Sequence, residues 1–400
     1  MKNGLRIICF RLVVNVILMC PVVLSAQFSR NENNSVARVS AVLKQHILNE
    51  AAWAMTQKPE TVTASSSPRS AGGIHDFFSE GDYWWPDPSW PDSPYVQRDG
   101  LTNPENFVAH RKAMIRFSKI VGALASAYIL TGETKYASRA MIHCKAWFID
   151  TATFMNPNLL FAQAIKGRAT GRGIGIIDTI HFMEVVQALM VFDRSTVIFT
   201  NEIRQTKTWF EQYLDWLTQH PYGKAEMNAL NNHGTCWVMQ VAAFSKFTGN
   251  KALMDFCRER YRTVLLPGQM ATDGSFPLEL KRTKPYGYSI FNLDAMVMIC
   301  QILSEGSLND LWNFKTPGGQ SIARGISYLY PYIAAKKNWP LKPDVMYWDQ
   351  WPVAQPFLLF GAIRFKNANW FEAWKTLDHS PVNDEVIRNL PIRNPLIWLN

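Results

Sequence analysis

Two consecutive stretches decide the fold: GTCWVMQVAAFSKFTGN at residues 234–250 and KALMDFCRERYRTVLLPGQM at residues 251–270. Apolar residues recur in both at the three- and four-residue spacing of an amphipathic helix. Gly249 stands between them, and a glycine at this place ends a helix with a left-handed cap and lets the chain turn back. The pattern therefore predicts two antiparallel helices joined as an αα-hairpin.

The same pattern occurs elsewhere in the chain. An apolar helical stretch at 107–131 ends before Gly132, and a second one begins at 133. Further helical spacing covers 36–55, 176–192, 197–218, 290–303, 318–335 and 356–365, whereas alternating strand patterns are scarce. About ten or more helices arranged as hairpins predict an all-α single domain, a closed or incomplete α/α toroid, although an irregular α-solenoid fits the same pattern.

The N-terminal residues have the composition of a secretory signal peptide. Lys2, Arg6 and Arg11 accompany an apolar run that ends in the small residues Ser25 and Ala26. This order predicts cleavage after Ala26, a mature domain at 27–400, and a periplasmic or secreted protein. A membrane anchor is the alternative, but the apolar run is short for a span. We expect no later membrane span, so we predict no membrane contact after the signal is removed.

The composition and charge of the chain limit the classes of partner that it is expected to bind. The chain has 400 residues, of which 48% are hydrophobic, 13% are aromatic and 15 are tryptophan. Removal of the signal peptide lowers the net charge from +9 to +6, and a modest basic excess suits an acidic partner. No Lys/Arg block or zinc-finger motif indicates nucleic acid. Export makes an acidic polysaccharide the better prediction. The four cysteines of the mature chain show no disulfide framework and are expected as buried free thiols.

The stretch NNHGTCW at 231–237 places two amides and an imidazole before an apolar helix. Asn231 or Asn232 can cap the helix, and His233 would then lie in its first turn, where the positive helix end disfavours the imidazolium form. One cap needs only one asparagine. The second asparagine and His233 are therefore candidates for a substrate site.

A second polar stretch, DGSFPLELKRTKPYGYSIFNLDAM at 273–296, contains Glu279, Arg282 and the tyrosines Tyr286 and Tyr288. A tyrosine at a helix start usually serves packing. A tyrosine beside several cations, however, is expected to have a more accessible phenolate, as a phenolic base requires.

Aromatic and glycine-rich segments supply further candidates. The clusters DYWWPDPSW at 82–90 and DVMYWDQWP at 344–352 suit either sugar rings or loop packing. The loop with Gly171, Gly173 and Gly175 lacks the spacing of a phosphate cradle, and its Gln163, Arg168 and Arg172 could pair with carboxylates. The eight histidines show no metal-binding spacing, so no metal or cofactor is predicted.

Taken together, these segments resemble the bacterial alginate-lyase-type polysaccharide lyases with an α/α toroid fold. The matching segments are GDYWWPDPSWPDSPYVQRDGLTNPENF, MNPNLLFAQAI with TGRGIGIIDT, NNHGT, DGSFPLELKRTKPYGYSIFNLDA and KPDVMYWDQWPVAQPFLLF. The resemblance implies four catalytic residues: Asn232, His233, Arg282 and Tyr288. A bulkier residue commonly precedes the catalytic tyrosine in the family, and here it is Gly287. Either Tyr286 fills the gap or a substrate contact is lost.

The resemblance also implies the reaction, β-elimination from a 4-linked uronate of alginate or glucuronan. The catalytic Tyr288 would act as general base and acid while Asn232, His233 and Arg282 neutralise the uronate carboxylate. One tyrosine suffices where the C5 proton and O4 are syn, as in mannuronate and glucuronate, and His233 is the candidate second base for guluronate. We expect the substrate contacts at Tyr83, Trp84, Arg98, Gln163, Arg172, Asn231, Glu279, Tyr286 and Trp348.

Two other functions fit the residues. A glycoside hydrolase on a similar toroid would need a pair of carboxylates, for which Asp273 and Glu279 are the nearest candidates. A non-catalytic exported glycan-binding protein would need only the tryptophan-rich loops.

Overall fold

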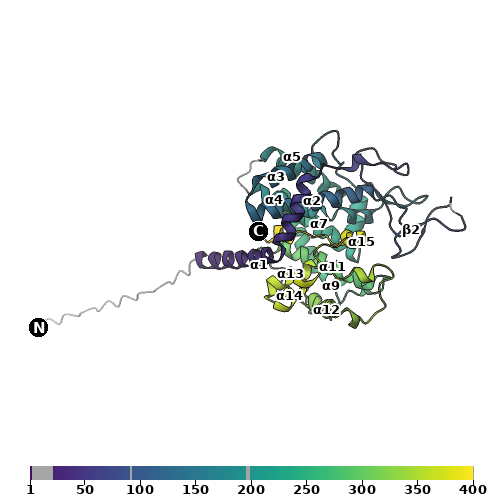
Figure 1. The fold of residues 1–400 in the computed structure, drawn as a ribbon. Coiled ribbons are helices and arrows are strands. Elements are labelled where there is room, and N and C mark those ends of the chain that lie inside the picture. Colours follow the sequence, from purple (N-terminus) through teal and green to yellow (C-terminus); the bar gives the residue numbers. More distant parts are fainter. Residues whose placement is uncertain (2–20, 91, 195–198, 400) are drawn as a thin grey trace.

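The computed structural model describes residue 1 and residues 21–90, 92–194 and 199–399, with residues 21–34 described by their backbone alone. Most of the predicted signal peptide, residues 2–20, lies outside the described residues. The described chain is predominantly helical (Figure 1), and the contacts between its helices define an inner and an outer layer.

The inner layer consists of five helices, each packed against the next: α2 (Ala109–Thr131), α4 (Phe182–Asp193), α7 (Asn232–Thr248), α11 (Pro285–Leu303) and α13 (Pro356–Phe365). The outer layer consists of α1 (Pro21–Thr56), α3 (Thr134–Phe148), α5 (Thr200–Gln219), α8 (Lys251–Arg260), α12 (Ile322–Ala334) and α14 (Ala368–Thr376). Each outer helix packs on one or two inner helices. This is the α/α toroid predicted from the hairpin repeat.

The C-terminal segment distinguishes the toroid from an open solenoid. The 3₁₀ helix η6 (Pro395–Trp398) returns to pack against α1, α2 and α4. In a solenoid each repeat contacts only its sequence neighbours. The contact between the last element and the first inner helices therefore excludes that alternative.

Glycines in the left-handed backbone conformation end the first helices of the predicted hairpins. Gly132 caps α2 with φ 70°, and Gly249 caps α7 with φ 79°. Each donates its backbone N–H to a carbonyl of the last helical turn. The turn positions read from the sequence are confirmed at both places.

Two inner helices are long and apolar enough to cross a membrane, contrary to the expectation that no later segment would be. They are α2 and α11, and 67% and 94% of their most apolar stretches are buried inside the protein. Neighbouring helices cover these side chains, so packing within the toroid accounts for their hydrophobic character.

The stretch predicted as one helix at 176–192 forms two elements. The 3₁₀ helix η2 (Gly173–Thr179) precedes α4 and is bent from it by 44°. The helix predicted at 290–303 begins earlier, at Pro285, because proline is well suited to the first turn of a helix. All four cysteines of the predicted mature chain are free and buried, as expected.

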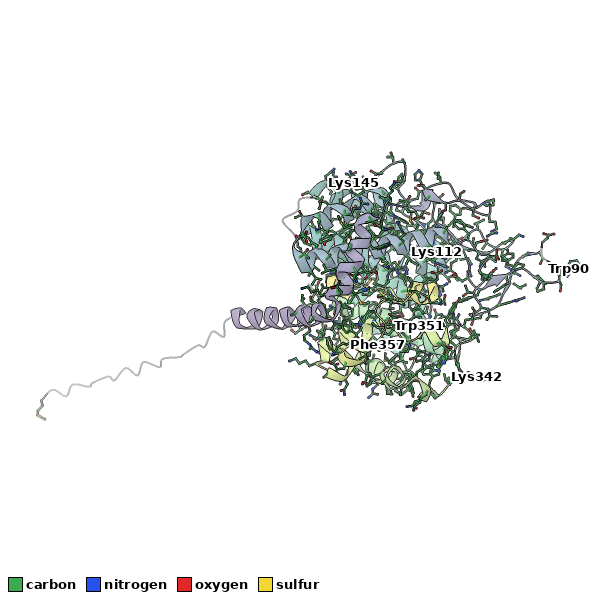
Figure 2. All side chains as sticks on the ribbon, in the orientation of Figure 1. Trp90, Lys112, Lys145, Lys342, Trp351 and Phe357 are labelled. Atoms are coloured by element: carbon green, nitrogen blue, oxygen red, sulfur yellow. The ribbon has the colours of Figure 1, made fainter. Side chains whose placement is uncertain are left out.

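Short strands lie in the loops at one end of the toroid. Strand β1 (Phe78–Glu80) pairs in parallel with β4 (Phe161–Ala164), and β2 (Trp84–Trp85) pairs antiparallel with β3 (Val96–Gln97). The loop that follows β2 projects from the molecule, with Trp90 72% exposed near its tip (Figure 2).

The remaining elements are short and connect the toroid helices. They are α6 (Pro221–Met227), α9 (Leu266–Gln269), α10 (Pro277–Leu280), α15 (Asp384–Arg388), the 3₁₀ helices η1 (Val62–Ala64), η4 (Lys336–Asn338) and η5 (Trp348–Gln350), and the π-helix η3 (Tyr261–Leu265).

Candidate active site

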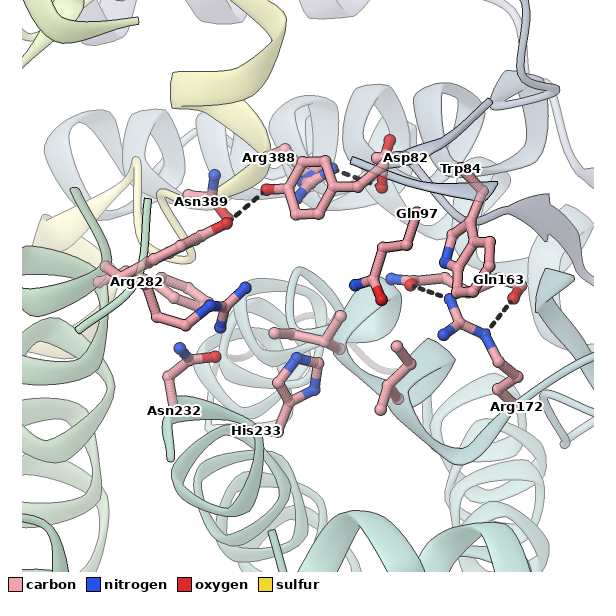
Figure 3. A pocket seen from close by; sticks show the side chains of 15 residues that line it. Asp82, Trp84, Gln97, Gln163, Arg172, Asn232, His233, Arg282, Arg388 and Asn389 are labelled. Carbon is pink, nitrogen blue, oxygen red and sulfur yellow. Dashed lines mark hydrogen bonds and ion pairs between the residues drawn. The ribbon is translucent and has the colours of Figure 1, made fainter. Parts of the chain in front are cut away.

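A pocket lies where the N-terminal ends of α7 and α11 meet the loops of the short strands (Figure 3). The residues that line it are Asp82, Tyr83, Trp84, Gln97, Gln163, Arg172, Ile174, Ile177, Asn232, His233, Arg282, Tyr288, Phe291, Arg388 and Asn389. The four predicted catalytic residues are thus brought together, although they come from separate parts of the chain. Three arginines and one aspartate line the pocket, so its charge suits an acidic ligand.

The start of α7 divides the two asparagines between different tasks. Asn231 is the N-cap, and its side-chain oxygen accepts a hydrogen bond from the backbone N–H of His233. Asn232 instead donates both its backbone N–H and its side-chain Nδ2 to the carboxylate of Glu279, at 2.7 and 2.8 Å. Glu279 is buried behind Asn232 and does not line the pocket, contrary to its prediction as a substrate contact.

His233 is held by a buried carboxylate from the preceding helix. Its Nδ1 lies 2.7 Å from Glu226 Oε1, and the Glu226 side chain is fully buried. A carboxylate at Nδ1 fixes the ring orientation and leaves Nε2 as the nitrogen available for other partners. Glu226 is part of the site although the sequence analysis did not select it, because no motif marks it.

Arg282 is fixed in place by Asp99 from the loop after β3. The guanidinium donates two hydrogen bonds to this carboxylate, from Nη2 at 2.7 Å and from Nε at 3.2 Å. Although burial opposes the effect, Asp99 raises the pKa of Arg282, so the guanidinium stays charged. It lies 4.6 Å from the centre of the Tyr288 ring.

Tyr288 donates its hydroxyl hydrogen to the hydroxyl oxygen of Tyr83, at 2.8 Å. The expectation that neighbouring cations make its phenolate more accessible is wrong. Burial raises the pKa of Tyr288 well above its usual value, and the neighbouring hydroxyl of Tyr83 raises it further, whereas Arg282 only partly opposes this shift. The hydroxyl is therefore protonated at neutral pH.

The opposite wall of the pocket is built by Trp84, Gln163 and Arg172 (Figure 3). Gln163 has a φ of 49°, a left-handed backbone conformation that is uncommon for residues other than glycine. The side-chain amide of Gln163 donates a hydrogen bond to Asp178. Arg172 donates to both oxygens of Gln163, at 2.8 and 3.3 Å, and lies over the Trp84 ring. Burial lowers the pKa of Arg172 to about 10, which still leaves it charged at neutral pH.

A buried ion network lies behind this wall and connects distant parts of the chain. Asp82 contacts Arg111 of α2 at 2.5 Å and Arg388 of α15 at 2.6 Å. Burial alone would raise the pKa of Asp82, but the two guanidinium groups hold it far below its usual range. Glu385 of α15 also forms a buried pair with Lys284.

Arg388 and Asn389, which line the pocket, are functional candidates that the sequence analysis missed. They belong to the short segment DEVIRN near the C-terminus, which has no motif or long helical pattern. Only the return of the C-terminal segment to α2 and to the turn between β1 and β2 brings them to the site.

Besides Glu279, four predicted substrate contacts lie outside the pocket: Asn231, which caps α7, and Tyr286, Trp348 and Arg98. Tyr286 is fully buried, donates to the carbonyl of Tyr332 and packs against Trp348. Trp348 lies beneath the Lys336 amine, 3.9 Å from its ring centre. The second aromatic cluster therefore serves packing at these positions. Arg98 is exposed and stacks on Trp85 at 5.4 Å.

Gly287 is required by the structure that surrounds it. The backbone N–H groups of Tyr286 and Gly287 each donate to Asp344 at 2.9 Å, so this carboxylate satisfies the first turn of α11. A Cβ at Gly287 would lie 2.9 Å from Asp344 Oδ2 and 3.3 Å from the Trp351 indole nitrogen. The glycine permits this close approach, and Tyr286 does not fill the position, because its side chain packs against Trp339 and Trp348.

The carboxylate pair of the hydrolase alternative is absent from the pocket. Asp273 is exposed and accepts a hydrogen bond from Ser275, and Glu279 is engaged with Asn232. Within the described part of the chain, no group of three or more His, Cys, Asp or Glu side chains could hold a metal ion.

Comparisons with known proteins agree with this arrangement. The sequence profile of the alginate lyase family matches residues 61–339. A crystal structure of an alginate lyase from Bacteroides ovatus is 30% identical, with a TM-score of 0.77 over 92% of this chain and 97% of that chain. A search of curated proteins gives no match.

Two more distant structures share the fold. Alginate lyase A1-III from Sphingomonas species A1 is 14% identical, with a TM-score of 0.53 over 80% of this chain and 87% of that chain. A histidine-to-alanine variant of alginate lyase A1-III, complexed with a tetrasaccharide, is 14% identical, with a TM-score of 0.58 over 88% and 93%. With the matched profile and the 30% identical structure, they lead to one conclusion: this chain belongs to the alginate lyase family and is a polysaccharide lyase with the α/α toroid fold.

Proposed function

We propose that this lyase cleaves 4-linked polyuronates, mannuronate-rich alginate or glucuronan, by syn β-elimination in the pocket between α7 and α11. The observation that carries the proposal is the convergence of Tyr288, Arg282, Asn232 and His233 on one cationic pocket. The tetrasaccharide bound by alginate lyase A1-III supports an oligosaccharide ligand. The signal peptide pattern supports a role outside the cytoplasm, in the periplasm or the medium.

The chemistry assigns a separate task to each group. The C5 proton of a uronate becomes acidic enough only when its carboxylate is neutralised, which Arg282 and Asn232 would do by charge and hydrogen bonding. Tyr288 would first lose its hydroxyl proton to solvent through the hydrogen bond to Tyr83, and the phenolate Oη would then take the C5 proton as the C4–O4 bond breaks and a C4=C5 double bond forms. The same hydroxyl would then return a proton to the departing O4.

The ring stereochemistry decides which sugars one tyrosine can process. In mannuronate and glucuronate the C5 hydrogen and O4 lie on the same face, within reach of a single hydroxyl. In guluronate they lie on opposite faces, so a second base is needed. His233 is the candidate, since its bond to Glu226 directs Nε2 away from that carboxylate.

Replacing Tyr288 with phenylalanine tests the base directly. Because the variant lacks the hydroxyl, we expect the turnover of polymannuronate to fall by roughly 10²- to 10⁴-fold, the usual contribution of general acid–base catalysis. Much of the substrate affinity should remain. The absorbance of the unsaturated product at ultraviolet wavelengths reports turnover, and calorimetry reports binding.

Tyr286→Phe is the matched control, since it removes a hydroxyl from the same helix outside the pocket. It should keep the activity and lose about 1 kcal/mol of stability, the net value of one hydrogen bond. An active Tyr288→Phe enzyme would show that the assignment of the base is wrong.

A comparison of polymers tests the substrate class and the glycan-binding alternative. Wild-type protein is incubated with polymannuronate, glucuronan and polyguluronate, and absorbance is followed alongside reducing ends. We expect absorbance to rise with one or both of the first two polymers. If the protein binds the polymers but the absorbance rises with none of the three, the result would contradict the proposed cleavage and support a glycan-binding protein.

A further inference from the structure

A second cavity lies at the opposite end of the toroid from the pocket. Its volume is about 740 Å³, and it is lined by residues from the last turns of α4, α7, α11 and α13 together with the C-terminal segment. Lys246 lies 14 residues after Asn232 on α7, which places it about 21 Å further along the helix. Figure 1 shows the C-terminus near α1, on the side of the molecule away from β2. We call this space the basal cavity.

The charges around the basal cavity are of one sign. Its lining includes Arg38, Arg194, Lys246, Arg364 and Lys366, whereas no Asp or Glu is found among the described residues that line it. Arg364 pairs with Asp310, outside the lining. Lys366 and Lys246 form no ion pair with any described residue.

Helix C-termini explain only part of this basic character. Lys246 Nζ donates to the carbonyl of Ile302 at 2.9 Å and so satisfies an end of α11. The partial negative charges of the four helix ends amount to about half an elementary charge each, about two charges in all. Arg38, Lys246 and Lys366 form no ion pair with a described residue, and their positive charge exceeds that of the helix ends. Burial together with Arg194 and Arg258 lowers the pKa of Lys246, although Glu305 opposes the shift. The cations are crowded, and a bound anion would relieve their repulsion.

The rest of the lining suits a sugar rather than a small inorganic anion. Trp312 and Trp398 contribute indole rings to the lining. Aromatic rings pack against the C–H faces of sugar rings. The volume falls in the range that holds a ligand of several rings, whereas a phosphate would leave most of it empty.

We propose that the basal cavity is a second binding site, separate from the catalytic pocket, for a short oligouronate. The cationic lining requires an anion, while the choice of a uronate rests on the proposed function. The carboxylates lie against Lys246 and Lys366, and the rings lie against the indoles of Trp312 and Trp398.

Calorimetric titration with a mannuronate tetrasaccharide tests the site. The Tyr288→Phe chain prevents turnover, and we expect it to bind two molecules per chain. In the same background, Lys246→Met with Lys366→Gln should bind one, or bind the second at least tenfold more weakly. Lys44→Gln with Lys58→Gln, which removes two exposed cations outside the cavity, is the charge-matched control and should still bind two.

The outcomes separate the cavity from the proposed function. A set of sites that disappears with the two lysines supports the basal cavity, whether or not wild-type protein degrades polymannuronate. Equal stoichiometry with and without the lysine substitutions overturns the proposal. So does a titration in which inorganic phosphate binds at these lysines and the tetrasaccharide does not.

Hydrogen exchange provides a measurement that needs no cavity variant. In the Tyr288→Phe chain, the tetrasaccharide should protect the amides of the last turns of α7, α11 and α13 as well as the first turns of α7 and α11. Protection at the first turns alone would contradict a basal site.

Discussion

At the scale of single residues, the site depends on carboxylates that do not themselves line the pocket. Asp99 holds Arg282, Glu226 holds His233 and Glu279 holds Asn232. Each of these carboxylates fixes a side chain proposed to contact substrate, so their replacement should affect catalysis through geometry rather than through direct contact.

Asp99→Asn is expected to reduce kcat/KM on polymannuronate by roughly 100-fold, the cost of a misplacement of about 1 Å. The amide keeps one acceptor for Arg282 but loses the charge and the second hydrogen bond. Steady-state kinetics measure the loss. Asp92→Asn, an exposed change in the loop between β2 and β3, should have wild-type kinetics. Equal kcat/KM for the two variants would mean that Asp99 does not position Arg282.

Glu226→Gln should lower kcat by roughly 100-fold for the same geometric reason, because the amide neither carries the charge nor fixes the imidazole in one orientation. The melting temperature, measured in parallel, should change by only a few degrees. Glu211→Gln on the exposed surface of α5 serves as the control. A variant with unchanged kcat would exclude a role for Glu226 in holding His233.

At the scale of the elements, α11 joins the site to the toroid. Asp344 caps its first turn next to Gly287, and Asp294 in its middle accepts the backbone N–H of Phe357 at the start of α13. Burial raises the pKa of Asp294 well above its usual value. The neutral form of its carboxyl group is thus favoured where α11 meets α13.

The Asp294→Asn variant tests whether the carboxyl group between α11 and α13 makes the stability depend on pH. The unfolded carboxyl ionises at lower pH than the folded one, so the wild-type loses stability as the pH rises from about 4 towards the raised pKa. Asparagine does not ionise. The melting temperature of the variant, relative to the wild-type, should therefore increase with pH over this interval. Asp215→Asn, at an exposed position of α5, should show a difference that does not vary with pH. A constant difference for Asp294→Asn would contradict the buried neutral carboxyl.

At the scale of the whole molecule, the C-terminal segment closes the toroid and completes the pocket. Arg388 of α15 reaches Asp82 in the turn between β1 and β2, and Arg111 of α2 reaches the same carboxylate. These ion pairs join residues that lie near opposite ends of the chain. Breaking one of these ion pairs should destabilise both the contact that closes the toroid and the wall of the pocket.

Arg388→Met should lower the free energy of unfolding by about 3 kcal/mol, because it leaves part of the charge of buried Asp82 and Glu385 uncompensated. Urea denaturation measures the loss. Lys112→Met breaks an exposed pair between α2 and Asp384 of α15, and its cost should be about 1 kcal/mol or less. Equal costs for the two variants would show that burial does not strengthen the Arg388 pair.

Much of the architecture followed from local sequence patterns. Helical spacing, the glycines at 132 and 249, and the proline at 356 depend on neighbouring residues, and those elements were predicted with their type and nearly their bounds. The short motifs also selected Asn232, His233, Arg282 and Tyr288, which the structure brings to one pocket. Their catalytic roles stay predictions for the variants above to test.

The sequence by itself determined the helical hairpins and the residue types of the site, because helix periodicity and capping act over a few residues. Only the tertiary structure decided which side chains face the pocket. In the tertiary structure, Tyr286 and Trp348 pack outside the pocket and Glu226 lies behind His233. Arg388 and Asn389, from near the C-terminus, line the pocket. The tertiary structure also decided the protonation of Tyr288, because burial depends on every element that surrounds the ring, and no local pattern records that burial.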